Sequence, residues 1–180
     1  MKSYRALCVC LLLIAQAAIS AEPGWIERGG KPLVEDTSRR SVAGFGGWLV
    51  VTPDVDWEAK WNTPKENTPS FNTADDVRQG ETLTILVFFA NPRLDKQRRA
   101  KVTCDIRVTR PDRTLSTNER GVLCAEGGAY GDSSTVYLSN LVVGFVGEPK
   151  DPLGTWVVDV TLHDDNASIV VPLKATFELK

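Results

Sequence analysis

Apolar and polar residues alternate along much of the second half of the chain. The clearest case is residues 100–110, where the apolar positions are Val102, Cys104, Ile106 and Val108. A period of two places successive side chains on opposite faces of an extended strand. The pattern therefore predicts a strand here with one buried face and one solvent-exposed face.

Other strand signals follow at regular intervals and are bounded by glycine, proline or asparagine. They cover residues 48–52, 81–90, 114–124, 134–146, 154–164 and 168–180, and the segment 134–146 reads as one bent strand or two short ones. About seven strands with almost no helical periodicity predict an all-β fold, an antiparallel β-sandwich, with an interrupted barrel as the alternative. A length of 180 residues suits a single domain.

Two segments lack this regularity. Residues 21–46 are rich in glycine, proline and charge, which predicts a flexible leader before a sandwich domain at 47–180. Residues 53–80 form a long polar, proline-punctuated loop, and such loops are typically functional or disordered. Within it, Asp54 or Asp56 is a candidate cap for a short helix that would place Trp57 and Trp61 on one face.

The first twenty residues have the order of a signal peptide. Lys2 and Arg5 precede an apolar stretch at 6–18, and small residues follow it, with Ser20 as the expected cleavage point and Ala21 as the alternative. The stretch is shorter than the roughly 20 residues that span a bilayer. We therefore expect a periplasmic or secreted protein with no transmembrane segment after cleavage; a retained membrane anchor is the alternative.

Two cysteines remain once the signal peptide, with Cys8 and Cys10, is removed. Cys104 and Cys124 would then lie in an oxidising compartment, where an even count predicts one disulfide. A metal site or a reactive thiol is the competing interpretation, but it lacks CxxC spacing and a nearby histidine. The sequence therefore predicts a disulfide and no metal or cofactor.

Charge and motif content exclude several classes of function. A net charge of -2 without a basic run gives no footprint for nucleic acid. The chain has no nucleophile elbow, zinc-protease motif, phosphate-binding loop or dinucleotide fingerprint. A catalytic triad would depend on His163 and its neighbours Asp164 and Asp165, for which an exposed hairpin end is the simpler interpretation. We therefore expect that the protein is not an enzyme.

Acidic residues are a second group of candidates for catalysis, and also for metal binding. The candidates for a glycosidase pair are Asp54, Asp56, Glu58, Asp75 and Asp76. The same acids, or Asp164, Asp165 and Asn166, contain the oxygen ligands that Ca²⁺ prefers, but neither group has EF-hand spacing. Solvated turn residues are the simpler interpretation of both groups.

The aromatic residues of the long loop are the most suggestive candidates for binding. Trp57, Trp61 and Phe71 stand among asparagine, threonine and acidic residues. Aromatic faces surrounded by hydrogen-bonding groups suit a sugar site or a protein-binding hot spot. The alternative is that they fold back and cover one end of the sandwich, while Trp48, Phe88 and Trp156 belong to the core.

A resemblance to a known family appears in the second half of the chain. The runs DIRVTRPDRT, DPLGTWVVDVTLHD and SIVVPLKATFELK resemble parts of immunoglobulin-like and fibronectin-type β-sandwich modules of exported bacterial proteins. Those modules have a Pro-x-Gly-Thr-aromatic corner before the penultimate strand, matched here by Pro152, Gly154, Thr155 and Trp156. The resemblance implies an Ig-like sandwich and no particular chemistry.

The chain departs from that pattern at two places. Trp156 stands where a corner tyrosine would be expected. Cys104 and Cys124 are too close in sequence for the inter-sheet bridge of antibody domains, so we expect them to join adjacent strands or a strand and its following loop.

Together these patterns indicate an exported, non-catalytic binding module. A protein partner in the cell envelope or the secreted space is the first expectation. Carbohydrate or cell-wall polysaccharide binding through Trp57 and Trp61 is the second, and a hydrolase is the third.

Overall fold

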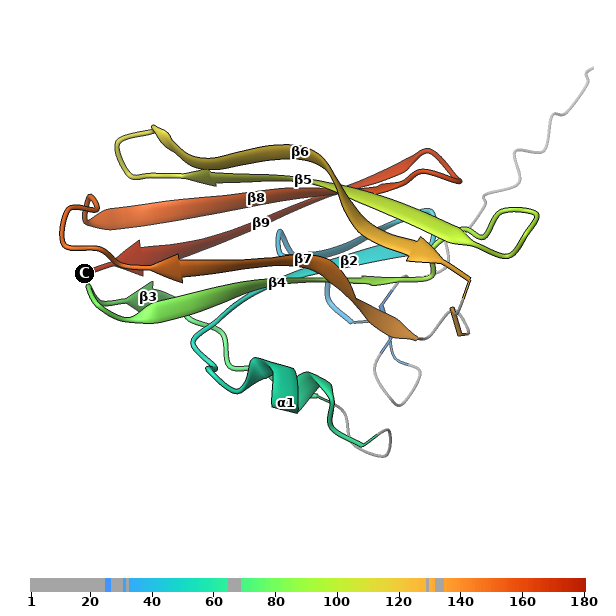
Figure 1. The fold of residues 1–180 in the computed structure, drawn as a ribbon, viewed down its shortest axis with the longest axis horizontal. Helices are drawn as coiled ribbons and strands as arrows, with labels where there is room; N and C mark the ends of the chain where they lie inside the picture. Colours follow the sequence, from blue (N-terminus) through green and yellow to red (C-terminus); the bar gives the residue numbers. More distant parts are fainter. Residues whose placement is uncertain (1–24, 27–30, 32, 65–68, 129, 132–134) are drawn as a thin grey trace, which may run out of the picture.

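Two β-sheets pack face to face in the computed structural model, which describes residues 25–26, 31, 33–64, 69–128, 130–131 and 135–180 (Figure 1). One sheet has the order β1-β2-β4-β7, formed by Arg39–Val42, Phe45–Thr52, Thr82–Ala90 and Val136–Val146. The other has the order β3-β9-β8-β5-β6, formed by Asp76–Val77, Ile169–Leu179, Gly154–Asp164, Ala100–Thr109 and Leu115–Gly127. The predicted signal peptide lies outside the described residues.

The antiparallel β-sandwich is confirmed. Every strand pair is antiparallel except β3 with β9. The described residues form nine strands where the sequence predicted about seven. The two additional strands, β1 and β3, have four and two residues, which is too short for an alternating pattern to be visible.

The core lies between the two sheets and follows the alternation along each strand. In β5 the four predicted apolar positions are all buried, and the burial alternates along the strand. The largest buried side chains of this core include Phe45, Phe89, Trp156 and Phe177. The Trp156 indole also donates a hydrogen bond of 3.2 Å to the Pro152 carbonyl, which fixes the corner before β8.

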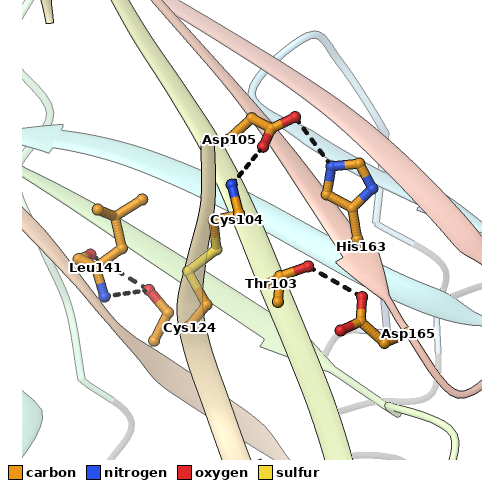
Figure 2. The surroundings of a disulfide bond; sticks show 9 residues. Thr103, Cys104, Asp105, Cys124, Leu141, His163 and Asp165 are labelled. Carbon is orange, nitrogen blue, oxygen red and sulfur yellow. Dashed lines mark hydrogen bonds and ion pairs between the residues drawn. A yellow bond between two sulfur atoms is a disulfide. The ribbon is translucent and has the colours of Figure 1, made fainter. Parts of the chain in front are cut away.

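The predicted disulfide is present and lies inside the sandwich. It joins Cys104 of β5 to Cys124 of β6, with 5.9 Å between the Cα atoms. Both cysteines are completely buried, and Figure 2 shows them between the polar face of β5 and Leu141 of β7. The bridge therefore links adjacent strands of one sheet, as the short sequence separation predicted.

Residues 39–46 were assigned to a flexible leader, and this part of the prediction is wrong. They form β1 and the start of β2. The segment shows no strand period because glycines occupy positions where a side chain would collide with another element. A Cβ atom on Gly47 would lie 2.6 Å from Leu162 Cδ1 in the facing sheet, and one on Gly46 would lie 2.9 Å from Trp25 Nε1.

A short helix, α1 (Trp57–Trp61), lies in the long loop between β2 and β3. In Figure 1 it lies beside β4 on the side away from the other sheet. Asp56 occupies its first flanking position but makes no side-chain capping hydrogen bond, so the predicted carboxylate cap is wrong. Asp54 has a different role, described below. In the described ranges no helix is both long and apolar enough to cross a membrane.

Candidate functional site

A second apolar cluster lies on the outer face of the four-stranded sheet. Its buried members are Val50, Leu86 and Phe88. Partly buried side chains pack on them, namely Trp48, Trp57, Trp61, Phe71, Val136 and Leu138. We call this group the outer aromatic cluster. Because apolar side chains cover both faces of β2 and β4, the sequences of these strands are continuous apolar runs without alternation.

Phe88 is the centre of the outer aromatic cluster. Its ring centroid lies 5.2 Å from that of Trp48, 5.3 Å from that of Trp61 and 5.4 Å from that of Phe71. These separations are those of favourable tilted ring pairs. Phe88 itself is 0% exposed, whereas the rings around it remain partly accessible to solvent.

The three predicted binding residues therefore lie together. Trp61 and Phe71 contact the Phe88 ring, and Trp57 packs against the same cluster. They also fold back onto the sandwich, but they cover the outer face of the four-stranded sheet and not the end of the sandwich that the alternative had expected. The part of each ring that stays exposed is available to a ligand.

A buried carboxylate fixes the loop that carries these rings. Asp54 accepts hydrogen bonds from the backbone N–H of Asn72 at 2.9 Å and from the Asn72 side-chain amide at 2.8 Å. The Lys60 ammonium group lies 2.8 Å from the same carboxylate. Asp54 thus joins the start of the loop to α1 and to the segment after Phe71.

The electrostatics of Asp54 match this role. Burial alone would raise the pKa of its carboxyl group, but the hydrogen bonds from Lys60 and Asn72 and the charge of Lys60 outweigh burial and lower the pKa to about 2. The carboxylate is therefore ionised at any physiological pH. The contacts of Asp54 with Lys60 and Asn72 therefore do not depend on pH in that range.

On the side of β1 the outer aromatic cluster continues from Trp48 to Trp25. Trp48 was predicted to be core, but it points away from the core because even-numbered positions of β2 face outward. Trp25 lies 6.3 Å from Trp48 in an edge-on arrangement and donates a hydrogen bond of 3.0 Å to the Arg40 carbonyl. The Arg39 guanidinium group lies over the Trp48 ring at 5.7 Å. The continuous apolar run of β2 contained no alternation that could have shown which face Trp48 occupies, and no local pattern identified Trp25.

A separate cavity of about 360 Å³ lies at one end of the sandwich. Its lining includes Phe45, Tyr130, Tyr137, Arg93 and Asp164. Asp164 is buried, and burial raises the pKa of its carboxyl group despite hydrogen bonds from the backbone N–H groups of Arg93, Ala167 and Asn166. These hydrogen bonds occupy both carboxylate oxygens, so Asp164 organises the β8–β9 turn.

Asn166 is also a structural residue. Its side-chain amide donates hydrogen bonds of 2.9 Å to the carbonyls of Arg93 and Arg99. The amide thereby ties the β8–β9 turn to the loop between β4 and β5.

The candidate histidine and acidic residues make other contacts than those considered for a catalytic triad. His163 Nε2 lies 3.2 Å from Asp105 on the outer face of the five-stranded sheet, so its carboxylate partner is neither Asp164 nor Asp165 (Figure 2). Asp76 pairs with Lys180 at 2.6 Å. The described residues contain no group of three or more side chains suited to a metal ion.

Comparisons with known proteins identify no family. No protein-family model and no curated protein matches the chain. Among solved structures, a family 123 glycoside hydrolase from Clostridium perfringens is similar over 74% of this chain, with 7% identity and a TM-score of 0.41. A Pseudomonas fluorescens alkylpurine DNA glycosylase bound to abasic-site DNA is similar over 59%, with 14% identity and a TM-score of 0.36. The chain spans only 27% and 28% of those two proteins.

Proposed function

We propose that this protein is an exported, non-catalytic binding module that contacts a protein partner through the outer aromatic cluster. The observation that carries the proposal is the way Trp57 and Trp61 are presented. Both are partly exposed, yet they stand on a loop that Asp54 fixes to Lys60 and Asn72. Aromatic side chains held on a rigid support bind with little loss of conformational entropy, which makes them effective hot-spot residues.

The polar surroundings of the cluster support a protein partner. A typical interface has an apolar centre with a polar rim. Here the exposed positions beside the rings include Glu58, Asn62 and Asn72. The Asp54 carboxylate is already neutralised by Lys60, so docking does not leave a buried charge without a partner.

Export is part of the proposal. A buried disulfide is typical of proteins that fold in an oxidising compartment, and it supports a periplasmic or secreted location. The charged segment ahead of the apolar stretch in residues 1–20 supports the same conclusion.

We further propose that the sandwich is of the immunoglobulin-like or fibronectin type. The Trp156 indole donates to the carbonyl of Pro152, four residues upstream. The corner tyrosine of such domains makes a comparable hydrogen bond to upstream backbone. Trp156 is thus a substitute for that tyrosine, with the indole N–H in place of the hydroxyl group.

A crosslinking pull-down from envelope and secreted fractions of the producing cells tests the binding proposal. Wild type should recover one protein in near-equal amount, and Trp57→Ala should lose it while remaining folded, with a melting temperature lowered by only a few degrees. Val55→Ala is the matched control, because Val55 lies two residues away and is 88% exposed. Equal recovery by all three forms would contradict the proposal. Retention on cell-wall polysaccharide that depends on Trp57, without a protein partner, would instead favour the carbohydrate alternative.

A further inference from the structure

Each sheet of the sandwich has two edge strands. The four edges differ in how well they are protected against pairing with another strand. An open edge exposes unpaired backbone N–H and C=O groups and can pair with another strand. The β9 side is closed, because β3 pairs with its end and the Thr37 carbonyl accepts a hydrogen bond of 2.7 Å from Lys174 N–H. The β1 edge has only four residues, and two of them are Arg39 and Arg40.

The β6 edge is long but irregular. Its pairing with β5 shifts register at three places. Gly121 adopts a φ of 61°, and the neighbouring Glu119 and Arg120 are exposed charges. Bulges and charges of this kind prevent a regular ladder from forming along an edge.

The second half of β7, residues 142–146, has none of these protective features. The sequence of the whole strand, VYLSNLVVGFV, contains no charged residue and no proline. Among the described residues β7 pairs only with β4. The one irregularity in this pairing lies opposite Val87, so residues 142–146 form a regular segment with an open outer edge.

The outward side chains of that segment are small and apolar. Val142 is 39% exposed and Val146 is 53% exposed. Gly144 lies between them, and a Cβ atom built on it would meet nothing within 4 Å. The outer aromatic cluster covers only the other half of the strand, through Val136 and Leu138.

We propose that β7 pairs with β7 of a second copy of this chain, antiparallel and centred on Gly144. A two-fold interface brings the same strand of each copy together. The strand that pairs with β7 is then another β7, which has the same open, regular and uncharged edge. In this register Gly144 faces Gly144 of the second copy, and Val142 of each copy faces Val146 of the other. The pairing covers both exposed valines and joins two four-stranded sheets into one.

The neutrality of β7 favours its own copy as the occupant. Like charges directly opposite each other destabilise a strand pair, and this strand places none there in any register. Valine is also among the residues enriched in strands, so Val142 and Val146 suit paired positions.

Sedimentation velocity of the purified protein over a range of concentrations tests the proposal. Wild type should reach twice the monomer mass. Gly144→Lys should stay monomeric, because it places two ammonium groups on the two-fold axis while its side chain meets open space in the monomer. Val170→Lys is the matched control, since Val170 is 45% exposed on the outer face of the other sheet, and it should dimerise like wild type.

A second variant locates the contact. Opposed residues in an antiparallel pair have Cα atoms about 4.5–5.5 Å apart, within the range that a disulfide can bridge. Gly144→Cys should therefore form a covalent dimer under mild oxidation, and Val170→Cys should not. A wild-type protein that is monomeric at its solubility limit would overturn the proposal. So would a Gly144→Lys variant that still dimerises, or crosslinking that is equal at the two positions.

Discussion

Phe88 and Trp57 show how differently two aromatic residues of one cluster contribute to stability. Phe88 is buried beneath three other rings, whereas Trp57 lies at the margin and keeps part of its ring in solvent. The same cluster can therefore contain a residue that holds the fold and a residue that is free to bind.

Truncation of the two rings should separate these roles. Phe88→Ala should lower the free energy of unfolding by about 3–5 kcal/mol, because it leaves a cavity beneath the cluster. Trp57→Ala should lower it by about 1 kcal/mol, because only part of its surface is removed from water. Denaturant unfolding monitored by circular dichroism measures both values. Equal losses would show that Trp57 is a core residue.

Asp54 predicts a specific pH dependence. Its pKa in the folded protein, about 2, is below the value of about 3.9 for an unfolded chain. The carboxylate therefore stabilises the fold fully above pH 4, and this contribution disappears as the pH falls towards 2. Asp54→Asn should cost about 1–3 kcal/mol at pH 7, and the difference from wild type should vanish near pH 2. A difference that is constant between pH 2 and 7 would contradict this role.

At the scale of the elements, β2 is the strand whose sequence is most constrained by its position. It lies between the core and the outer aromatic cluster, so its odd-numbered positions face one apolar layer and its even-numbered positions face another. Gly46 and Gly47 sit where each layer comes closest to the backbone.

Alanine at these two glycines should have distinct effects. Gly47→Ala places a methyl group against Leu162 of the facing sheet and should destabilise the protein by about 1–3 kcal/mol. Gly46→Ala meets the Trp25 indole and should displace that side chain while the core stays intact. Tryptophan fluorescence and thermal unfolding distinguish the two results. Loss of stability in Gly46→Ala as large as in Gly47→Ala would contradict the two-layer description.

How well a strand could be predicted from the sequence depends on whether one or both of its faces are buried. The alternating strand β5 was recognised because one of its faces meets water, and β8 was predicted with its observed bounds, Gly154–Asp164. The burial of β2 on both faces hid the orientation of Trp48. The Asp54 network could not be predicted, because it depends on Asn72, which is eighteen residues away and is brought close only by the path of the loop.

At the scale of the whole molecule, both the disulfide and the core between the two sheets stabilise the fold. The bridge closes a loop with a sequence separation of 20 and ties the edge strand β6 to its neighbour β5. The disulfide could be predicted from a signal-peptide pattern and two remaining cysteines. Disulfide formation depends on the redox compartment and on the number of cysteines as well as on geometry.

Removal of the bridge should weaken the protein without changing its fold. Replacement of both cysteines by alanine should lower the free energy of unfolding by roughly 3 kcal/mol, the value expected for a loop of this size. The far-ultraviolet circular dichroism spectrum should keep its β-sheet form, because β5 also pairs with β8. An unchanged free energy of unfolding would contradict a stabilising role of the bridge. Loss of the β-sheet signal would contradict the expectation that the fold forms without it.

Site-specific photocrosslinking in the producing cells tests the binding surface most directly. A photoreactive amino acid at Ala59, an exposed position of α1, should give one crosslinked product of defined mass. The same group at Val170, on the outer face of the opposite sheet, should give none. A product at both positions, or at Val170 alone, would contradict a binding role for the outer aromatic cluster.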